Sequence, residues 1–412
     1  RRRLEYPIGR VLVESTPDSY FCLSSPRVAP GGDRVAYIDC EAASGAMEIR
    51  TVDLQGRQQR DYRGRPYSRD TAESVWGLSW APAGDKIWFA RRQPGGLVEL
   101  MASELRGGVR RLGTLGGPLF DVSSRHEALT AVYSQRGCIV VRRSDEPAER
   151  ELGCGENPLG LARSTGFTLS ADGRFVVNGE AVGSERPRVL LRPTNGSPPV
   201  PLGEGLWGEL SADGASALLL TDDQRDLQLV PTGAGEARSL PTAPLRVYAA
   251  RFFADGRRVL LGAAEPGRAG RLWVLDLAGG PPRPITPEQV GVGVPSPDGR
   301  WVAAAGFDGA ALYPVEGGER RSLGDLGSLH FPIVWSDDGC CVYWYPVNLE
   351  GTSLTILKMD VRTGERSAWR EIAPKDPAGL NALEPQMTAD GRTYAYGYSR
   401  VLSTLNLVSG LR

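Results

Sequence analysis

The sequence predicts an all-β protein built from one short structural unit that is repeated along its 412 residues. Three observations support this prediction. A tight-turn motif, in which Asp precedes Gly, recurs at nearly regular intervals between short apolar segments. The 52 Gly and 31 Pro residues are dispersed along the chain, as in folds with many short strands and tight turns. Helical periodicity is almost absent, apart from one expected turn near Asp376–Asn381.

The spacing of the glycines in these turns gives the number of repeats. Their successive intervals are 52, 89, 41, 42, 43, 40 and 52 residues. The interval of 89 is about twice the others, so it is expected to contain a degenerate unit with Ser123–His126 at the turn. The sequence therefore predicts nine units. The turn glycines are Gly32, Gly84, Gly173, Gly214, Gly256, Gly299, Gly339 and Gly391.

Each unit is expected to contain four short antiparallel strands. One strand precedes the turn and a second follows it, as in "FFADGRRVLLG". A third strand ends in a Gly turn, as in "RLWVLDLAGG", and a brief fourth strand such as "RPIT" completes the unit. Such a sheet cannot bury its two faces alone, but repeated sheets stacked radially can bury them against each other. The period and the strand order therefore predict a β-propeller whose blades are these units.

Two arrangements of the nine units are compatible with the sequence. In one, residues 1–412 form a single closed propeller, and the N-terminal segment "IGRVLVES" completes the last blade. In the other, residues 161–412 form a six-bladed ring, and residues 1–160 are the rear part of a first propeller that begins upstream of Arg1. The boundary of this second arrangement is expected at Cys154–Thr165. Both arrangements remain open, although nine blades exceed the usual range of about four to eight.

The turn sequences Ser-Pro-Asp-Gly and Ser-Ala-Asp-Gly resemble those of TolB-type and dipeptidyl-peptidase-type propellers rather than WD40 repeats. The segments "RRLEYPIGRVLVES", "LSWAPAGDKIWFARR" and "GRTYAYGYSRVLSTLNLVSGL" are similar to TolB-like propeller regions appended to bacterial serine/threonine protein kinases. This resemblance covers essentially the whole chain. It implies that a kinase domain lies upstream in a longer protein and that the propeller is extracytoplasmic or periplasmic. The residues themselves leave the location unknown.

Composition and motifs exclude several classes of function. The 48 Lys and Arg residues balance 49 Asp and Glu residues, which argues against a nucleic-acid-binding protein. The sequence has no apolar run of 18 residues that could form a transmembrane helix. Kinase motifs and the Gly-x-Ser-x-Gly motif of α/β-hydrolases are absent, and the chain has only two histidines. We therefore expect a chain that is not an enzyme and that holds no metal or cofactor.

The cysteines allow two disulfides without requiring them. Cys22 and Cys40 fall in neighbouring predicted strands, as do Cys138 and Cys154, but free buried thiols are equally compatible with this spacing. Cys340 and Cys341 are expected to point to opposite faces of one strand, which argues against a shared metal site.

Two other motifs are expected to be structural. The aspartate of each turn is predicted to accept hydrogen bonds from the amides of its own turn. The segment "GEGLWG", residues 203–208, matches a phosphate-binding pattern, but a strand follows it where a helix would be needed. We interpret it as a connector between blades.

Binding is the function that the sequence favours, at the loops that lead into the first strand of each blade. Four aromatic residues in or near such loops are the candidate contacts: Trp76, Trp207, Tyr248 and His330. Trp301 and Trp344 are instead expected to pack between blades. The prediction is a module that binds a protein, a peptide or a small molecule at one propeller face, as the sensor region of a receptor-like kinase. The alternatives are a periplasmic TolB-like scaffold and a propeller hydrolase or lyase with a site in the channel.

Overall fold

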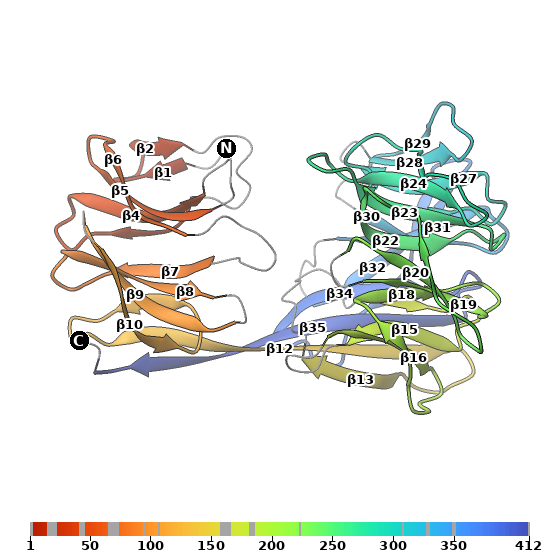
Figure 1. Cartoon of the computed structure of the whole chain (residues 1–412), viewed down its shortest axis with the longest axis horizontal. Coiled ribbons are helices and arrows are strands. Elements are labelled where there is room, and N and C mark those ends of the chain that lie inside the picture. The colour runs from red at the N-terminus through yellow and green to blue at the C-terminus, as the bar shows by residue number, and fades with distance from the viewer. Residues whose placement is uncertain are drawn as a thin grey trace. The chain divides into compact units, whose positions relative to one another are not determined.

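The computed structural model confirms the all-β fold. It describes residues 3–14, 23–40, 46–64, 74–93, 96–105, 108–156, 166–180, 186–221, 224–306, 309–326, 330–347 and 352–410. These ranges contain strands β1 to β35 and no helix (Figure 1). The helical turn expected near Asp376–Asn381 is wrong, because Ala378 and Gly379 form a tight turn that leads directly into a strand. Within these ranges no helix could cross a membrane.

The chain folds into two compact units. Unit 1 consists of Arg1–Ser134 and Leu402–Arg412, and unit 2 consists of Gln135–Val401. Two long strands, β12 (Ala128–Arg143) and β35 (Thr393–Val408), each begin in one unit and end in the other (Figure 1). The first unit boundary therefore lies within β12 and precedes Cys154–Thr165, where the six-bladed arrangement placed it. The difference arises because the second half of β12 and the following strand β13 (Arg150–Glu156) belong to unit 2.

Unit 2 contains six antiparallel blades, which we call A to F: A to E are four-stranded sheets, and F is the part of a five-stranded sheet that lies in unit 2. Blade A comprises β14 (Phe167–Leu169), β15 (Phe175–Glu180), β16 (Arg188–Pro193) and β17 (Val200–Glu204). Blade B comprises β18 (Trp207–Leu210), β19 (Ser216–Leu220), β20 (Leu227–Pro231) and β21 (Arg238–Leu240). Blade C comprises β22 (Arg246–Phe252), β23 (Arg258–Ala264), β24 (Arg271–Asp276) and β25 (Arg283–Pro284).

The next two blades continue the same order. Blade D comprises β26 (Gly293–Pro295), β27 (Trp301–Gly306), β28 (Gly309–Pro314) and β29 (Arg321–Gly324). Blade E comprises β30 (His330–Trp335), β31 (Cys341–Pro346), β32 (Leu354–Asp360) and β33 (Arg366–Ile372).

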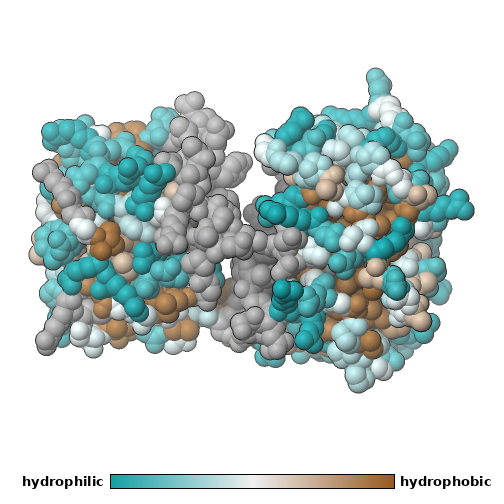
Figure 2. Space-filling model, in the orientation of Figure 1, coloured by the Kyte–Doolittle hydropathy of each residue, from teal (hydrophilic) through white to brown (hydrophobic). Residues whose placement is uncertain are grey.

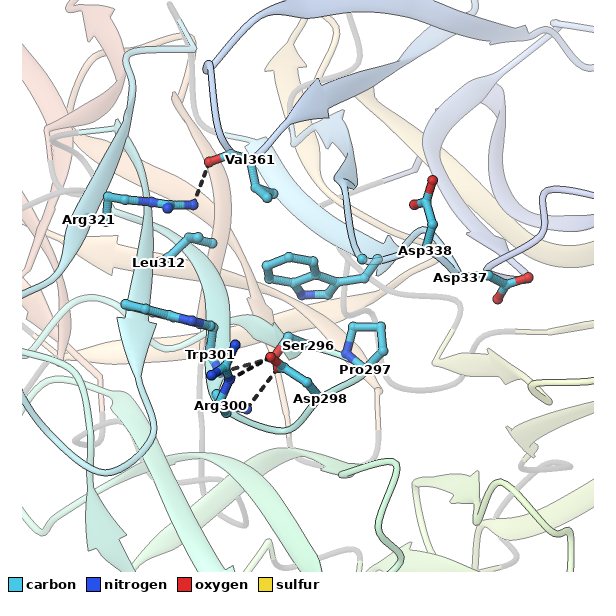
Figure 3. Close-up of a pocket in the computed structure, with 12 residues that line it drawn as sticks. Ser296, Pro297, Asp298, Arg300, Trp301, Leu312, Arg321, Asp337, Asp338 and Val361 are labelled. Atoms are coloured by element: carbon cyan, nitrogen blue, oxygen red, sulfur yellow. Dashed lines mark hydrogen bonds and ion pairs between the residues drawn. The ribbon is translucent and has the colours of Figure 1, made fainter.

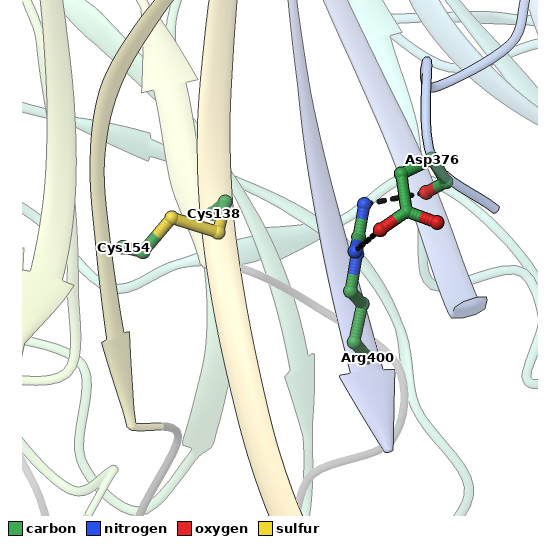
Figure 4. The surroundings of a disulfide bond; sticks show 4 residues. All are labelled: Cys138, Cys154, Asp376 and Arg400. Carbon is green, nitrogen blue, oxygen red and sulfur yellow. Dashed lines mark hydrogen bonds and ion pairs between the residues drawn. A yellow bond between two sulfur atoms is a disulfide. The ribbon is translucent and has the colours of Figure 1, made fainter. Parts of the chain in front are cut away.

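Blade F closes the ring with strands from both ends of unit 2. Its order is β34 (Leu380–Met387), β35, β12 and β13, so its first two strands are C-terminal and its last two are N-terminal. A disulfide joins Cys138 of β12 to Cys154 of β13 (Figure 4). The first strands of successive blades contact each other around the whole ring, including β34 with β14. Closure by the N-terminal segment "IGRVLVES" is wrong, because its strand β2 (Val11–Glu14) pairs with β1 (Arg3–Glu5).

Unit 1 contains the remaining sheets. The strands β3 (Ser24–Val28), β4 (Arg34–Cys40), β5 (Met47–Asp53) and β6 (Gln58–Arg63) form one four-stranded blade. A second blade consists of β7 (Ser74–Trp80), β8 (Lys86–Arg92), β9 (Val98–Glu104) and β10 (Val109–Leu115). A further strand, β11 (Leu119–Val122), pairs with the first half of β12. Cys22, the possible disulfide partner of Cys40, lies outside the described residues.

Every turn that was counted in the sequence joins the first two strands of a sheet. At the degenerate turn, His126 takes the left-handed conformation, with φ of 61°, that Gly takes at the other turns. In blade D, Asp298 Oδ1 accepts hydrogen bonds from Ser296 Oγ at 2.6 Å and from the Arg300 N–H at 3.1 Å. Equivalent bonds occur in blades A, B, E and F. The predicted structural role of these aspartates is therefore confirmed.

The core lies between blades. Trp344 is fully buried between blades D and E, and Trp301 packs at the edge of the same cluster. Cys138 of β12 and Tyr396 of β35 lie in another cluster, with residues of blade E. Stacking of one sheet on the next therefore supplies the apolar burial that a single blade lacks. On the outside, Figure 2 shows mostly polar residues on the visible face, with an apolar band over the middle of unit 2.

One carboxylate links the two halves of blade F. Glu149 accepts hydrogen bonds from Tyr394 Oη at 3.2 Å and from Tyr396 Oη at 2.9 Å, and both tyrosines are buried. Glu149 lies between β12 and β13, whereas both tyrosines lie on β35. The carboxylate therefore fastens the N-terminal strands of the ring to the C-terminal ones.

We predict that Glu149→Ala lowers the free energy of unfolding by about 1–3 kcal/mol, because two buried phenol hydroxyls lose their acceptor. Urea denaturation followed by tryptophan fluorescence measures this change. The exposed Glu151, on the adjoining strand, provides the control variant Glu151→Ala, which should change stability little. An equal decrease in the free energy of unfolding of the two variants would show that the hydrogen bonds of Glu149 do not stabilise unit 2.

Candidate functional site

The first strands of all six blades of unit 2 surround one cavity of about 320 Å³. Each first strand contributes the residue that lies two positions before the first residue of the following turn. In blade D, for example, the turn begins at Ser296 and the contributed residue is Val294. Because this position recurs in every blade, the six residues form one ring around the cavity. The ring consists of Thr168, Glu209, Arg251, Val294, Val334 and Gln386.

The ring has a polar side and an apolar side. Four successive blades, F, A, B and C, contribute Gln386, Thr168, Glu209 and Arg251. The other two, D and E, contribute valines. A ligand in this cavity would therefore meet hydrogen-bonding and charged groups along one side and an aliphatic surface along the other.

Glu209 and Arg251 are the charged pair of this ring. Glu209 Oε2 lies 3.9 Å from Arg251 Nε, and its Oε1 accepts a hydrogen bond of 3.0 Å from the N–H of Phe252. Arg251 Nη1 donates to the carbonyl of Ile333 in blade E at 3.0 Å. These contacts hold both side chains in place, and Arg251 reaches from blade C to blade E past blade D.

Burial changes the acid–base behaviour of Glu209. Removal from water raises the pKa of Glu209 to about 7, although Arg251 and the Phe252 N–H favour the carboxylate. Nearby, burial and then the charge of Glu384 raise the pKa of Tyr345, while Arg251 opposes that change. Glu209 therefore gains or loses its proton near neutral pH, inside a ring that also holds a guanidinium group.

A groove leads outward from the cavity between blades D and E (Figure 3). It has a volume of about 300 Å³ and shares Ser296, Pro297, Trp335 and Asp337 with the central cavity. One wall carries the Ser296–Asp298–Arg300 hydrogen bonds seen in Figure 3. Beyond it, the Arg321 guanidinium lies 5.8 Å from the Trp301 ring and donates to the Val361 carbonyl. The cavity and the groove are thus adjacent within unit 2 and share these four lining residues.

The four aromatic residues singled out in the sequence do not line this site. Trp76 belongs to β7 in unit 1, where the Arg92 guanidinium lies 4.7 Å from its ring. Trp207, Tyr248 and His330 all lie on first strands of unit 2, but none contributes to the cavity or the groove. Tyr248 fits against three glycines, and burial raises its pKa to about 12. Partner binding through these four residues stays a prediction.

Sequence reasoning missed Glu209 and Arg251, although a signal for them was present. Aligning the blades on their turns places both residues in the same column, two positions before the turn. That column is central because first strands face the axis of a propeller. A comparison of this position across the six blades, rather than a comparison of the loops, identifies the six residues of the ring.

The structure also corrects the expectation for Cys340 and Cys341. Cys341 is the first residue of β31, but Cys340 lies in the preceding turn, so the alternation of strand side chains does not apply to it. The two Sγ atoms are 2.7 Å apart rather than on opposite faces. The pair follows Asp338 and Gly339, which line the groove.

Among the described residues, one group has the spacing of metal ligands: Cys138, Glu151 and Cys154. Its two cysteines are joined in the disulfide, so their sulfurs are not available as thiolate ligands. The segment "GEGLWG" runs from β17 into β18, as expected of a connector.

No protein-family model matches the chain, and no curated protein matches it. Solved structures do. A putative TolB from Agrobacterium tumefaciens is 17% identical, with a TM-score of 0.45, over 65% of this chain and 99% of that one. An oligogalacturonate lyase in complex with manganese is 16% identical, with a TM-score of 0.43, over 66% of this chain and 75% of that one. A prolyl endopeptidase is 14% identical, with a TM-score of 0.38, over 89% of this chain and 52% of that one.

These similarities agree with the resemblance to TolB-type and dipeptidyl-peptidase-type propellers. They contradict the expectation that the chain is not an enzyme, because the similar structures include a peptidase and a lyase. That expectation was derived from missing kinase and hydrolase motifs. The absence of these motifs does not exclude an active site that is formed by side chains of the propeller itself.

The pKa of Glu209 predicts a pH dependence of stability. As pH rises from about 4.5, Glu209 of the unfolded chain loses its proton, while the folded chain keeps its proton until pH about 7. The folded state is therefore destabilised progressively across this range, by about 3 kcal/mol in total. Urea denaturation at a series of pH values should show this fall in the wild type but not in Glu209→Gln. Parallel curves for the two proteins would contradict the assignment.

Proposed function

We propose that unit 2 is a ligand-binding propeller whose ligand carries a carboxylate and an apolar portion. The observation that carries this proposal is the two-sided ring, in which Arg251 of blade C stands beside the valines of blades D and E. A guanidinium presents several N–H donors in a plane that matches a carboxylate. The valines of blades D and E provide a surface for the apolar portion of the same molecule.

The groove favours a ligand longer than the cavity, such as the carboxyl-terminal end of a peptide. Its carboxylate would bind at Arg251, and the preceding residues would run outward along the groove past Trp335. Trp301 and Arg321 offer a flat surface for stacking at the outer part of this path. The site thereby suits an extended chain end better than a globular partner surface.

The wider role that we propose is that of a sensor region in a bacterial receptor-like kinase, where ligand capture in the channel is the sensed event. The attachment to a kinase is supported by the sequence resemblance alone. The reading frame upstream of Arg1 tests it directly.

A second candidate is a hydrolase or lyase that uses the same site. The observation in its favour is Glu209, because a carboxyl group with a pKa near 7 is suited to proton transfer at neutral pH. Release of product from carboxylate-bearing peptides or sugar acids, lost in Glu209→Gln, would distinguish catalysis from binding alone.

We predict that short peptides with an apolar last residue bind through their free carboxylate. In calorimetry, the free-acid peptides should bind at least about tenfold more tightly than their carboxyl-terminal amides, since a charged hydrogen bond contributes about 1.5–3 kcal/mol. Arg251→Ala should abolish this difference. Arg246→Ala, on the same strand but outside the cavity, should preserve it.

The affinity for the free acid should also fall as pH rises through about 7, because the ionised Glu209 then repels the ligand carboxylate. The amides should lack this dependence. Equal binding of acid and amide, or no binding across the panel, would contradict the proposed ligand class.

A further inference from the structure

The adjacent thiols of Cys340 and Cys341 form an unusual pair at the wall of the groove. Their Sγ atoms are 2.7 Å apart, although neither takes part in a disulfide in this structure. Cys341 is buried, whereas Cys340 is partly exposed. One sulfur can therefore be reached from solvent, and the other lies directly behind it.

The turn holds the two cysteines in this arrangement. Asp338 Oδ1 accepts the Cys340 N–H at 3.0 Å, and Ser336 Oγ accepts the Cys341 N–H at 3.0 Å. These are the same bonds that the other Ser-x-Asp-Gly turns make, and Ser336 Oγ with the Cys340 N–H holds the pKa of Asp338 at about 2. The backbone of the pair is thus fixed by the repeat, and the two cysteines are an addition that occurs in blade E alone.

The same unit already contains an oxidised pair, Cys138–Cys154. Disulfides form and persist in oxidising compartments. A chain that keeps this disulfide closed is exposed to conditions under which a second close pair of thiols is oxidised as well.

We propose that Cys340 and Cys341 form a reversible vicinal disulfide, a redox-sensitive modification site at the groove. The oxidant is a small-molecule disulfide of the glutathione type. The Cys340 thiolate attacks one of its sulfurs and displaces the first thiol, which leaves Cys340 in a mixed disulfide. Cys341 then attacks the Cys340 sulfur, the Cys341 proton passes to the departing sulfur, and the second thiol is released. Overall, two protein thiols lose two protons and two electrons, one S–S bond forms, and the oxidant becomes two thiols.

The proposed bond is reversible for a geometric reason. Adjacent Cα atoms lie about 3.8 Å apart across a trans peptide, below the range of about 4.4–6.8 Å usual for disulfides. The resulting strain makes such a bond easier to reduce than an unstrained one. Since Asp338 and Gly339 line the groove, closing the ring beside them would stiffen that wall.

Mass spectrometry tests the proposal on the chain of 412 residues. The tryptic peptide from Ser322 to Lys358 contains Cys340 and Cys341 and no other cysteine. The protein is produced in an oxidising compartment, unfolded in urea with excess iodoacetamide and then digested. Unfolding exposes buried thiols, so only a disulfide protects the pair from alkylation. We expect an unalkylated peptide that is lighter by two hydrogen atoms, and two alkylations of that peptide after reduction.

Two controls make the outcome decisive. The peptides that carry Cys138 and Cys154 should remain joined in the same unreduced sample. In Cys341→Ser, the remaining Cys340 should be alkylated without prior reduction. Double alkylation of the wild-type peptide while Cys138–Cys154 stays linked would overturn the proposal. So would a disulfide from Cys340 to any other cysteine.

Reversibility is measured on the folded protein with reduced glutathione before the same alkylation. The Cys340–Cys341 peptide should become doubly alkylated. A pair that stays closed under conditions that open Cys138–Cys154 would show a permanent structural disulfide and overturn the reversible site.

Discussion

Unit 2 depends on the pairing of β35 with β12, which joins the end of its chain to the beginning within blade F. Without this ladder the first and last blades would each present an unpaired edge and an uncovered apolar face. The hydrogen bonds of Glu149 to its two tyrosines cross this ladder, and the Cys138–Cys154 disulfide fixes β13 to β12 beside it. Closing the ring costs conformational entropy of the chain only once. Every pair of neighbouring blades can then bury its apolar faces in the core between them.

Ring closure also creates the candidate site. Six first strands meet around one axis only because the last blade contacts the first, through β34 and β14. The geometry makes one position in every blade a member of the same ring, so residues from distant parts of the chain become neighbours. Glu209 contacts the backbone of Phe252, and Arg251 contacts that of Ile333, across sequence separations that no local motif encodes. Burial at this axis then gives Glu209 a pKa near neutrality.

The repeated turn maintains the architecture of each blade, whereas the residues beside it differ between blades. Its Ser, which is Thr in blade F, donates to the turn Asp in blades A, B, D, E and F. The residues beside this frame are free to differ, and they differ where chemistry is expected. Glu209 and Arg251 occupy the column that holds valine in blades D and E, and Cys340 and Cys341 directly follow the turn glycine, Gly339, of blade E.

The sequence by itself determined the all-β fold, the nine turns and their internal hydrogen bonds, because these follow from local backbone preferences and short-range side-chain contacts. It also determined that Trp344 would be buried between blades. Only the tertiary structure decided which strands close unit 2, since β12 and β35 are more than 200 residues apart in the chain. It alone decided that Glu209 and Arg251 share a cavity and that two adjacent thiols touch. Those facts depend on how distant segments converge and on where a turn ends and a strand begins, which a one-dimensional pattern does not specify.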